Sequence, residues 1–85
     1  MDVVTFIHEL TWDALPEAAR LYARRCLLDT LGAGLGGRGT ALSRIVFDFA
    51  AQAYGGRGAR LWVDGREVSP AGAALANGMT VDALD

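Results

Sequence analysis

The sequence predicts a mainly helical fold that carries one short β-hairpin. Two long segments, residues 16–35 and 40–54, place apolar residues at the three- and four-residue spacing of an amphipathic helix. A third signal is the Asp64-Gly65 pair between two short β-prone runs, which is typical of a tight hairpin turn. A chain of 85 residues makes at most one domain.

The first half of the chain is predicted to form two helices. A short helix is expected over residues 3–10, where apolar residues cluster. The second, over residues 16–35, begins with Pro16 and Glu17, because proline loses no hydrogen bond in a first turn and an acidic residue suits the positive end of the helix dipole. Its apolar stripe consists of leucines, namely Leu21, Leu27, Leu28, Leu31 and Leu35. The glycines that follow are expected to end this helix.

The second half is predicted to contain a helix, the hairpin and a last helix. The helix over residues 40–54 ends at a Gly-Gly pair, and the hairpin spans residues 60–68. A two-residue turn at Asp64-Gly65 would place Leu61 opposite Val68 and Val63 opposite Arg66.

The last helix, over residues 70–84, is apolar on almost every side. Ser69 is the expected N-cap and Pro70 the first helical residue. Such a helix is normally buried, and three other helices from an 85-residue chain can hardly enclose it. We therefore expect it to pack within a larger body, of which these residues are one part.

Composition excludes several classes of function. All eight basic residues are arginines, so the chain has no lysine for a Schiff base, a phosphate-binding loop or a general base. The net charge of −2 argues against a nucleic-acid surface. The single cysteine, the uncharged stretches that are too short to span a bilayer and the missing secretory signal together favour a cytoplasmic protein without membrane contact.

Several candidate sites have simpler structural explanations. The run Gly32–Gly37 matches G-x-G-x-x-G, but it follows a predicted helix, whereas a dinucleotide site needs a preceding strand. His8 is expected to be an ordinary surface or core residue, and Cys26 a packed thiol. Four arginines in predicted loops or in the hairpin are interpreted as solvated turn residues, with a carboxylate-binding site as the sharper alternative: Arg38, Arg57, Arg60 and Arg66.

The last helix carries the most suggestive cluster. Asp82 and Asp85 follow Gly78 by four and seven residues, so all three share one helical face. Two carboxylates on an apolar helix are costly to bury while ionised, and such pairs occur at acid–base sites. Gly78 would leave open space beside them. The alternative is that Asp85 is merely exposed near a helix end.

Three segments together resemble the MmgE/PrpD family. They are the last helix from Ser69 to Gly78 with Ala83-Leu84-Asp85, the helix segment Cys26–Gly32, and the hairpin Leu61–Arg66 between them. The resemblance covers nearly the whole chain but only about the opening fifth of a family member. It implies that residues 1–85 are the N-terminal portion of an all-helical domain. The rest of that domain and a smaller α+β domain would lie outside this chain, in a protein that is usually a homodimer.

The resemblance also implies chemistry. Family activities include 2-methylcitrate dehydration, cis-aconitate decarboxylation and iminodisuccinate epimerisation, all on small polycarboxylates and without a required metal or organic cofactor. Each plausible route develops carbanion-like charge beside a carboxylate, which calls for a positioned base. Asp85 matches the first aspartate of the family's acidic cluster and is the catalytic candidate. Asn77 and Gly78 match its N-G motif, as packing and site-lining residues, and Asp82 stands where many members have histidine.

Two functions therefore remain open from the sequence. The first is a portion of a lyase or isomerase that acts on a polycarboxylate and is inactive as an isolated 85-residue chain. The second is a non-catalytic helical module that docks through its Ala/Gly-rich last helix. A sharp, cooperative unfolding transition of a monomer would favour the module.

Overall fold

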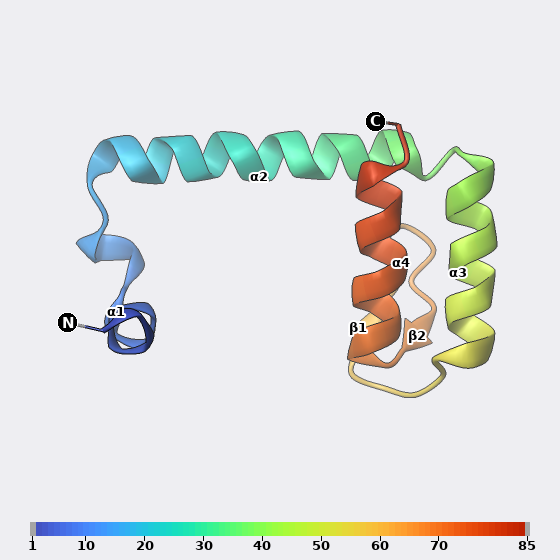
Figure 1. Ribbon diagram of the computed structural model, residues 1–85. Coiled ribbons are helices and arrows are strands. Elements are labelled where there is room, and N and C mark those ends of the chain that lie inside the picture. Colours follow the sequence, from blue (N-terminus) through green and yellow to red (C-terminus); the bar gives the residue numbers. More distant parts are fainter. Residues whose placement is uncertain (1, 85) are drawn as a thin grey trace.

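The computed structural model describes residues 2–84 and confirms a mainly helical fold with one small sheet (Figure 1). The four α-helices in these residues are α1 (Val3–Glu9), α2 (Glu17–Gly37), α3 (Ala41–Ala53) and α4 (Pro70–Asp82). A 3-10 turn, η1 (Trp12–Ala14), precedes α2, and strands β1 (Ala59–Arg60) and β2 (Glu67–Val68) precede α4. None of these helices has the length and apolarity that a bilayer-spanning helix needs.

Local sequence signals account for where most of these helices begin. The side chains of Asp2, Thr40 and Ser69 cap α1, α3 and α4 by accepting hydrogen bonds from backbone N–H groups three residues later. Pro16 stands at the N-cap position of α2, one residue before the helix begins, and makes no side-chain capping hydrogen bond. The helix α2 continues two residues beyond the predicted end, through its glycines to Gly37.

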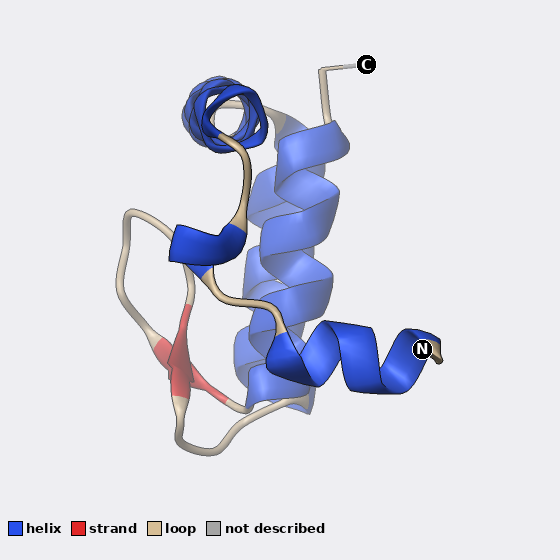
Figure 2. Cartoon of the chain, turned by 90° about the vertical axis from the view of Figure 1, so that its left-hand side faces the viewer, coloured by secondary structure: helices blue, strands red, loops and turns tan. Residues whose placement is uncertain are grey.

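The core lies between α3, α4 and the hairpin. The helices α3 and α4 run antiparallel, and the two strands form a layer beside them (Figure 2). Phe47, Leu61 and Val68 are at most 1% exposed and are the largest apolar side chains of this core. It is completed by smaller residues and one valine, namely Val46, Ala50, Ala73 and Ala76.

The helix α2 crosses the C-terminal end of α4, and glycines of α2 lie at the crossing. A Cβ atom added at Gly34 would collide with the ring of Trp62, and one added at Gly37 would collide with the backbone carbonyl of Thr80. These residues lie inside a helix, and the dinucleotide motif therefore lacks the strand that it requires. The glycines instead permit close helix packing.

The hairpin register differs from the prediction. Ala59 pairs with Val68 and Arg60 with Glu67, so Leu61 is not opposite Val68 and Val63 is not opposite Arg66. The chain needs a longer turn because the residue after Leu61 turns away to meet α4. The turn is closed by a 3.0 Å bond from the Gly65 N–H to the Leu61 carbonyl, and Val63 adopts a left-handed φ of 75°.

At the other end of the molecule, η1 is tied to the first turns of α2. The Arg20 guanidinium donates to the Leu15 carbonyl at 2.8 Å, and the Arg24 guanidinium lies 5.2 Å from the centre of the Trp12 ring. Beyond η1, α1 has no buried residue. Figure 1 shows α1 and α4 on the same side of α2 and at opposite ends of it.

Candidate functional site

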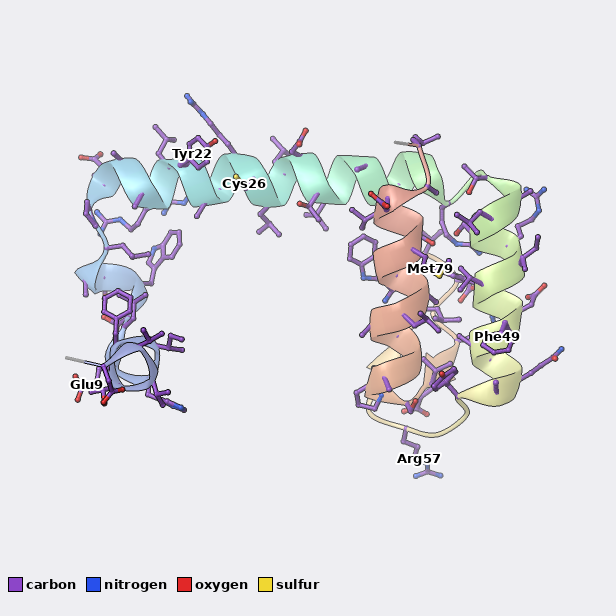
Figure 3. All side chains as sticks on the ribbon, viewed as in Figure 1. Glu9, Tyr22, Cys26, Phe49, Arg57 and Met79 are labelled. Carbon is purple, nitrogen blue, oxygen red and sulfur yellow. The ribbon has the colours of Figure 1, made fainter. Side chains whose placement is uncertain are left out.

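One face of α4 is exposed, and it carries Gly78 and Asp82, two of the residues that the sequence singles out. Nothing lies within 4 Å of a Cβ built on Gly78, so the predicted open space is present. Asp82, the last residue of the helix, is exposed one turn further on. Asp85, the catalytic candidate, lies outside the described residues. Met79, which follows Gly78 along α4 (Figure 3), is 38% exposed.

The opposite face of α4 is packed, which fixes the direction in which the exposed face points. Gly72, Ala73, Ala76 and Thr80 are buried against α2, α3 and the hairpin. The hydroxyl groups of Thr80 and Ser43 form a buried hydrogen bond of 2.7 Å. Each hydroxyl thereby satisfies the other, as a buried polar group requires.

Asn77 connects α4 to the hairpin. Its Oδ1 accepts a hydrogen bond from the Trp62 N–H at 3.0 Å, and its Nδ2 donates to the Arg60 carbonyl at 3.2 Å. The two bonds lie on either side of the buried Leu61. They bind backbone groups that would pair with the opposite strand if β1 continued beyond Arg60. Asn77 therefore ties α4 to the hairpin, whose backbone takes up its side-chain amide next to Gly78.

A chain of charges joins the hairpin loop to α2 and α3. Asp64 lies 3.3 Å from the Arg38 guanidinium and 3.0 Å from that of Arg66, and Arg66 reaches Asp48 at 3.1 Å. The expectation of a solvated turn residue was wrong for Arg38, whose side chain is only 18% exposed and lies 3.9 Å above the Phe47 ring. Its acidic partner is 26 residues away in the sequence, and no local pattern reveals it.

This arrangement shifts the ionisation of its members. Burial raises the pKa of Asp64, but hydrogen bonds from the backbone and side chain of Arg66, with the charges of Arg66 and Arg38, outweigh that effect and leave the pKa below its ordinary value of 3.8. The pKa of Arg66 is raised, mainly by its hydrogen bond to Asp64. The carboxylate that these arginines bind therefore belongs to Asp64 of the same chain and not to a ligand. The role of this network is structural.

The remaining candidates lie far from α4. Cys26 is exposed, and the expectation of a packed thiol was wrong because none of the described elements covers that side of α2. His8 is exposed on α1, as an ordinary surface residue would be. Within residues 2–84, no three metal-ligating side chains come together.

The described residues therefore offer one wall of a candidate site. It consists of the open surface beside Gly78, with the Asp82 carboxylate at its edge. The opposite face of the same helix is packed against α2, α3 and the hairpin. A carboxylate in this position can take or hold a proton of a bound molecule once a second wall excludes water. Neither opposing donors nor a further base stands opposite it within the described residues.

Comparison with known proteins gives one match. Residues 1–85, the whole chain, match a family model described as the MmgE/PrpD N-terminal domain. Searches among curated proteins and among solved structures gave no match.

Proposed function

Since this chain belongs to the MmgE/PrpD family, which is a family of enzymes that includes dehydratases and decarboxylases, we propose that the exposed face of α4 is the first wall of an active site for a small polycarboxylate. The reaction would be a dehydration, decarboxylation or epimerisation that passes through a carbanion-like intermediate. The observation that carries this proposal is the open surface at Gly78 beside Asp82, on the otherwise apolar α4.

The proposal assigns a different task to each residue. Asp85 is the base that removes a proton next to a substrate carboxylate, an assignment that rests on sequence spacing and on the family motif. Asp82 takes the place of the family's frequent histidine, and Gly78 provides the space in which the substrate lies. Asn77 sets the position of this surface through its two bonds to the hairpin.

The exposed face of α4 alone is not enough for this reaction. A carbanion-like intermediate needs donors aimed at the developing charge, and the paired arginines Arg38 and Arg66 are engaged by Asp64. We propose that residues 1–85 are the N-terminal portion of the enzyme and that later segments supply these donors. The isolated chain is then inactive toward 2-methylcitrate, cis-aconitate and iminodisuccinate, and measurable turnover by it would contradict this part of the proposal.

A chimera tests the assignment of the wall. Residues 1–85 replace the corresponding segment of an MmgE/PrpD enzyme with measurable turnover, and the steady-state kinetics of the chimera and its variants are compared. Asp85→Asn should lower kcat by about 100-fold or more, the usual effect of losing a general base. Asp82→Asn should act mainly on KM. Glu67→Gln, an exposed acid on β2, is the matched control and should leave both constants unchanged.

The same chimera separates the enzyme from the non-catalytic module. If it turns over substrate but Asp85→Asn retains full kcat, the catalytic assignment is wrong. If Asp82→Asn and Asp85→Asn both behave like Glu67→Gln, the exposed face of α4 is not part of the active site.

A further inference from the structure

Apolar burial alone does not account for the way α4 faces its neighbours. Two of its larger apolar side chains, Leu75 and Met79, are 37% and 38% exposed. The residues that it buries are small, namely Gly72, Ala73, Ala76 and Thr80. Burial of apolar area by itself would favour the larger side chains inside. The rotation of α4 about its own axis therefore has a further cause, and a buried hydrogen bond can provide one because it is directional.

Thr80 makes such a bond. Its side chain is fully buried, and its hydroxyl oxygen lies 2.7 Å from the Ser43 hydroxyl oxygen of α3. Its backbone carbonyl meets α2 at Gly37, where a Cβ atom would not fit. Within residues 2–84, Ser43 and Thr80 are the only buried polar residues. Thr80 therefore joins α4 to both neighbouring helices at one point.

Ser43 is itself held in place. It lies in the first turn of α3, where its backbone N–H donates to the Thr40 hydroxyl at 3.1 Å, and that hydroxyl donates to the Gly37 carbonyl at 2.7 Å. The Ser43 hydroxyl also accepts a hydrogen bond of 3.2 Å from Arg38 Nη1. The same guanidinium pairs with Asp64 of the hairpin loop. The partner of Thr80 is thus fixed by contacts to the α2–α3 turn and to the hairpin loop.

Thr80 lies directly behind the exposed face of α4. Successive residues of an α-helix are about 100° apart around its axis, because one turn takes roughly 3.6 residues. Gly78 and Asp82 are each two residues from Thr80, and so each is about 200° away from it. Both are exposed, on the side opposite Thr80. A rotation of α4 that breaks the Thr80 bond would turn this face by the same angle.

We propose that Ser43 and Thr80 are positioning residues, whose hydrogen bond sets the direction in which Gly78 and Asp82 face the substrate. This inference rests on the proposed function, because it takes the exposed face of α4 as a wall of the active site. Both side chains are fully buried, and they act through α4 without touching a bound molecule. Asn77 bonds the hairpin at a second point, so α4 can neither rotate nor slide without losing a hydrogen bond.

Distances between spin labels test the orientation of α4 in the 85-residue chain, independently of any reaction. Labels are attached at the exposed positions Asp82→Cys on α4 and Ile45→Cys on α3, with Cys26→Ser to remove the native thiol. One narrow distance distribution is expected. Thr80→Val keeps the shape of the side chain but removes its hydroxyl, and should broaden the distribution or add a second distance. Thr80→Ser, which keeps the hydroxyl, should leave it narrow.

The chimera with an active family enzyme tests the effect on catalysis. Thr80→Val and Ser43→Ala should each lower kcat/KM by about 10-fold or more, because a displacement of roughly 1 Å in a positioned group can cost a large factor in rate. Thr80→Ser should retain most of the activity. Val46→Ala is the matched control, since it removes buried apolar atoms from α3 and leaves both hydroxyls in place. Circular dichroism checks that each variant is folded, and Ser43→Ala leaves the sequence of α4 unchanged.

A double-mutant cycle separates positioning from a loss of folded enzyme. Thr80→Val should lower kcat/KM less in an Asp82→Asn background than in the wild type, whereas a loss of folded enzyme would lower both by the same factor. Equal factors, or a spin-label distribution that stays narrow in Thr80→Val and Ser43→Ala, would overturn this inference.

The aspartate variants show which proposal has failed. If Asp82→Asn and Asp85→Asn are impaired while Thr80→Val and Ser43→Ala keep wild-type kcat/KM, the positioning role is wrong and the proposed function stands. If both aspartate variants behave like Glu67→Gln, the proposed function fails and the positioning role fails with it.

Discussion

The two halves of this molecule are similarly rich in apolar residues but differ in how they are covered. The half formed by α3, the hairpin and α4 closes around Phe47, which is fully buried. The half formed by α1, η1 and α2 buries only Gly34 and Gly37, both where α2 meets the other half. The half with α3, the hairpin and α4 has its own buried core, whereas the other half contacts it, within residues 2–84, only through the end of α2.

This difference comes from long-range contacts more than from local sequence. The leucines of α2 recur at helical spacing, although its apolar and polar residues are less clearly separated on two faces than those of α3, and Leu28 is 72% exposed whereas Val46 is 6% exposed. The helix α3 gains its burial because the hairpin and α4 return alongside it, and no later described segment returns to the middle of α2. The stability of the chain should therefore reside in the α3–hairpin–α4 half.

The strongest test of this comparison is truncation of one aromatic side chain in the covered half. Phe47→Ala should destabilise the chain by about 3–5 kcal/mol, because it removes a fully buried ring and leaves a cavity. Phe49→Ala is the matched control on the same helix, since Phe49 is 51% exposed, and it should cost less than about 1 kcal/mol. Urea unfolding followed by circular dichroism measures both. Equal losses would show that the core is not centred on Phe47.

A smaller effect is expected at the contact between the halves. Gly37→Ala should destabilise by about 1–3 kcal/mol, because the new methyl group meets the Thr80 carbonyl and pushes α2 away from α4. Gly32→Ala, five residues earlier on the same helix, meets nothing within 4 Å and should stabilise by about 1 kcal/mol through helix propensity alone. Thermal unfolding of the two variants should shift in opposite directions. A shift in the same direction would mean that the Gly37 contact is not what joins the halves.

Features with a local cause could be predicted from the sequence. The α3 and α4 helices begin where Thr40 and Ser69 provide caps, and α2 follows the leucine periodicity after Pro16. The open space at Gly78 also follows from local sequence, because a glycine on an otherwise apolar helix leaves a gap on its own surface.

Features set by distant partners could not be predicted. The hairpin turn is longer than the two residues Asp64-Gly65, because the Trp62 N–H donates to the Asn77 side chain instead of pairing across the hairpin. Asn77 lies 15 residues further along the chain, so no local pattern shows this bond. Arg38 is partly buried because it contacts Asp64 and Phe47. Cys26 is exposed because none of the described elements packs on its side of α2. In each case a pattern of residue types indicates which helix forms but not which elements meet.

The smallest expected effect is an acid-sensitive link between the halves. Asp64 in the hairpin loop pairs with Arg38, which caps the C-terminal end of α2. Its pKa is lower in the folded chain than its ordinary value of 3.8, so its stabilising contribution is complete above that value and is lost as the pH falls through the folded pKa. Because Asp64 is partly exposed, the contribution should be only about 1 kcal/mol.

Urea unfolding at neutral pH and below about pH 4 measures this link, since the carboxylate titrates only in the acid range. Asp64→Asn should lose stability at neutral pH and show a weaker loss on acidification than the wild type. Asp29→Asn, an exposed acid on α2 outside the ion pairs formed within residues 2–84, should keep the wild-type pH dependence. If Asp64→Asn and the wild type lose stability in parallel as the pH falls, then the halves are joined by the Gly34 and Gly37 packing alone, and the charge chain only shapes the hairpin loop.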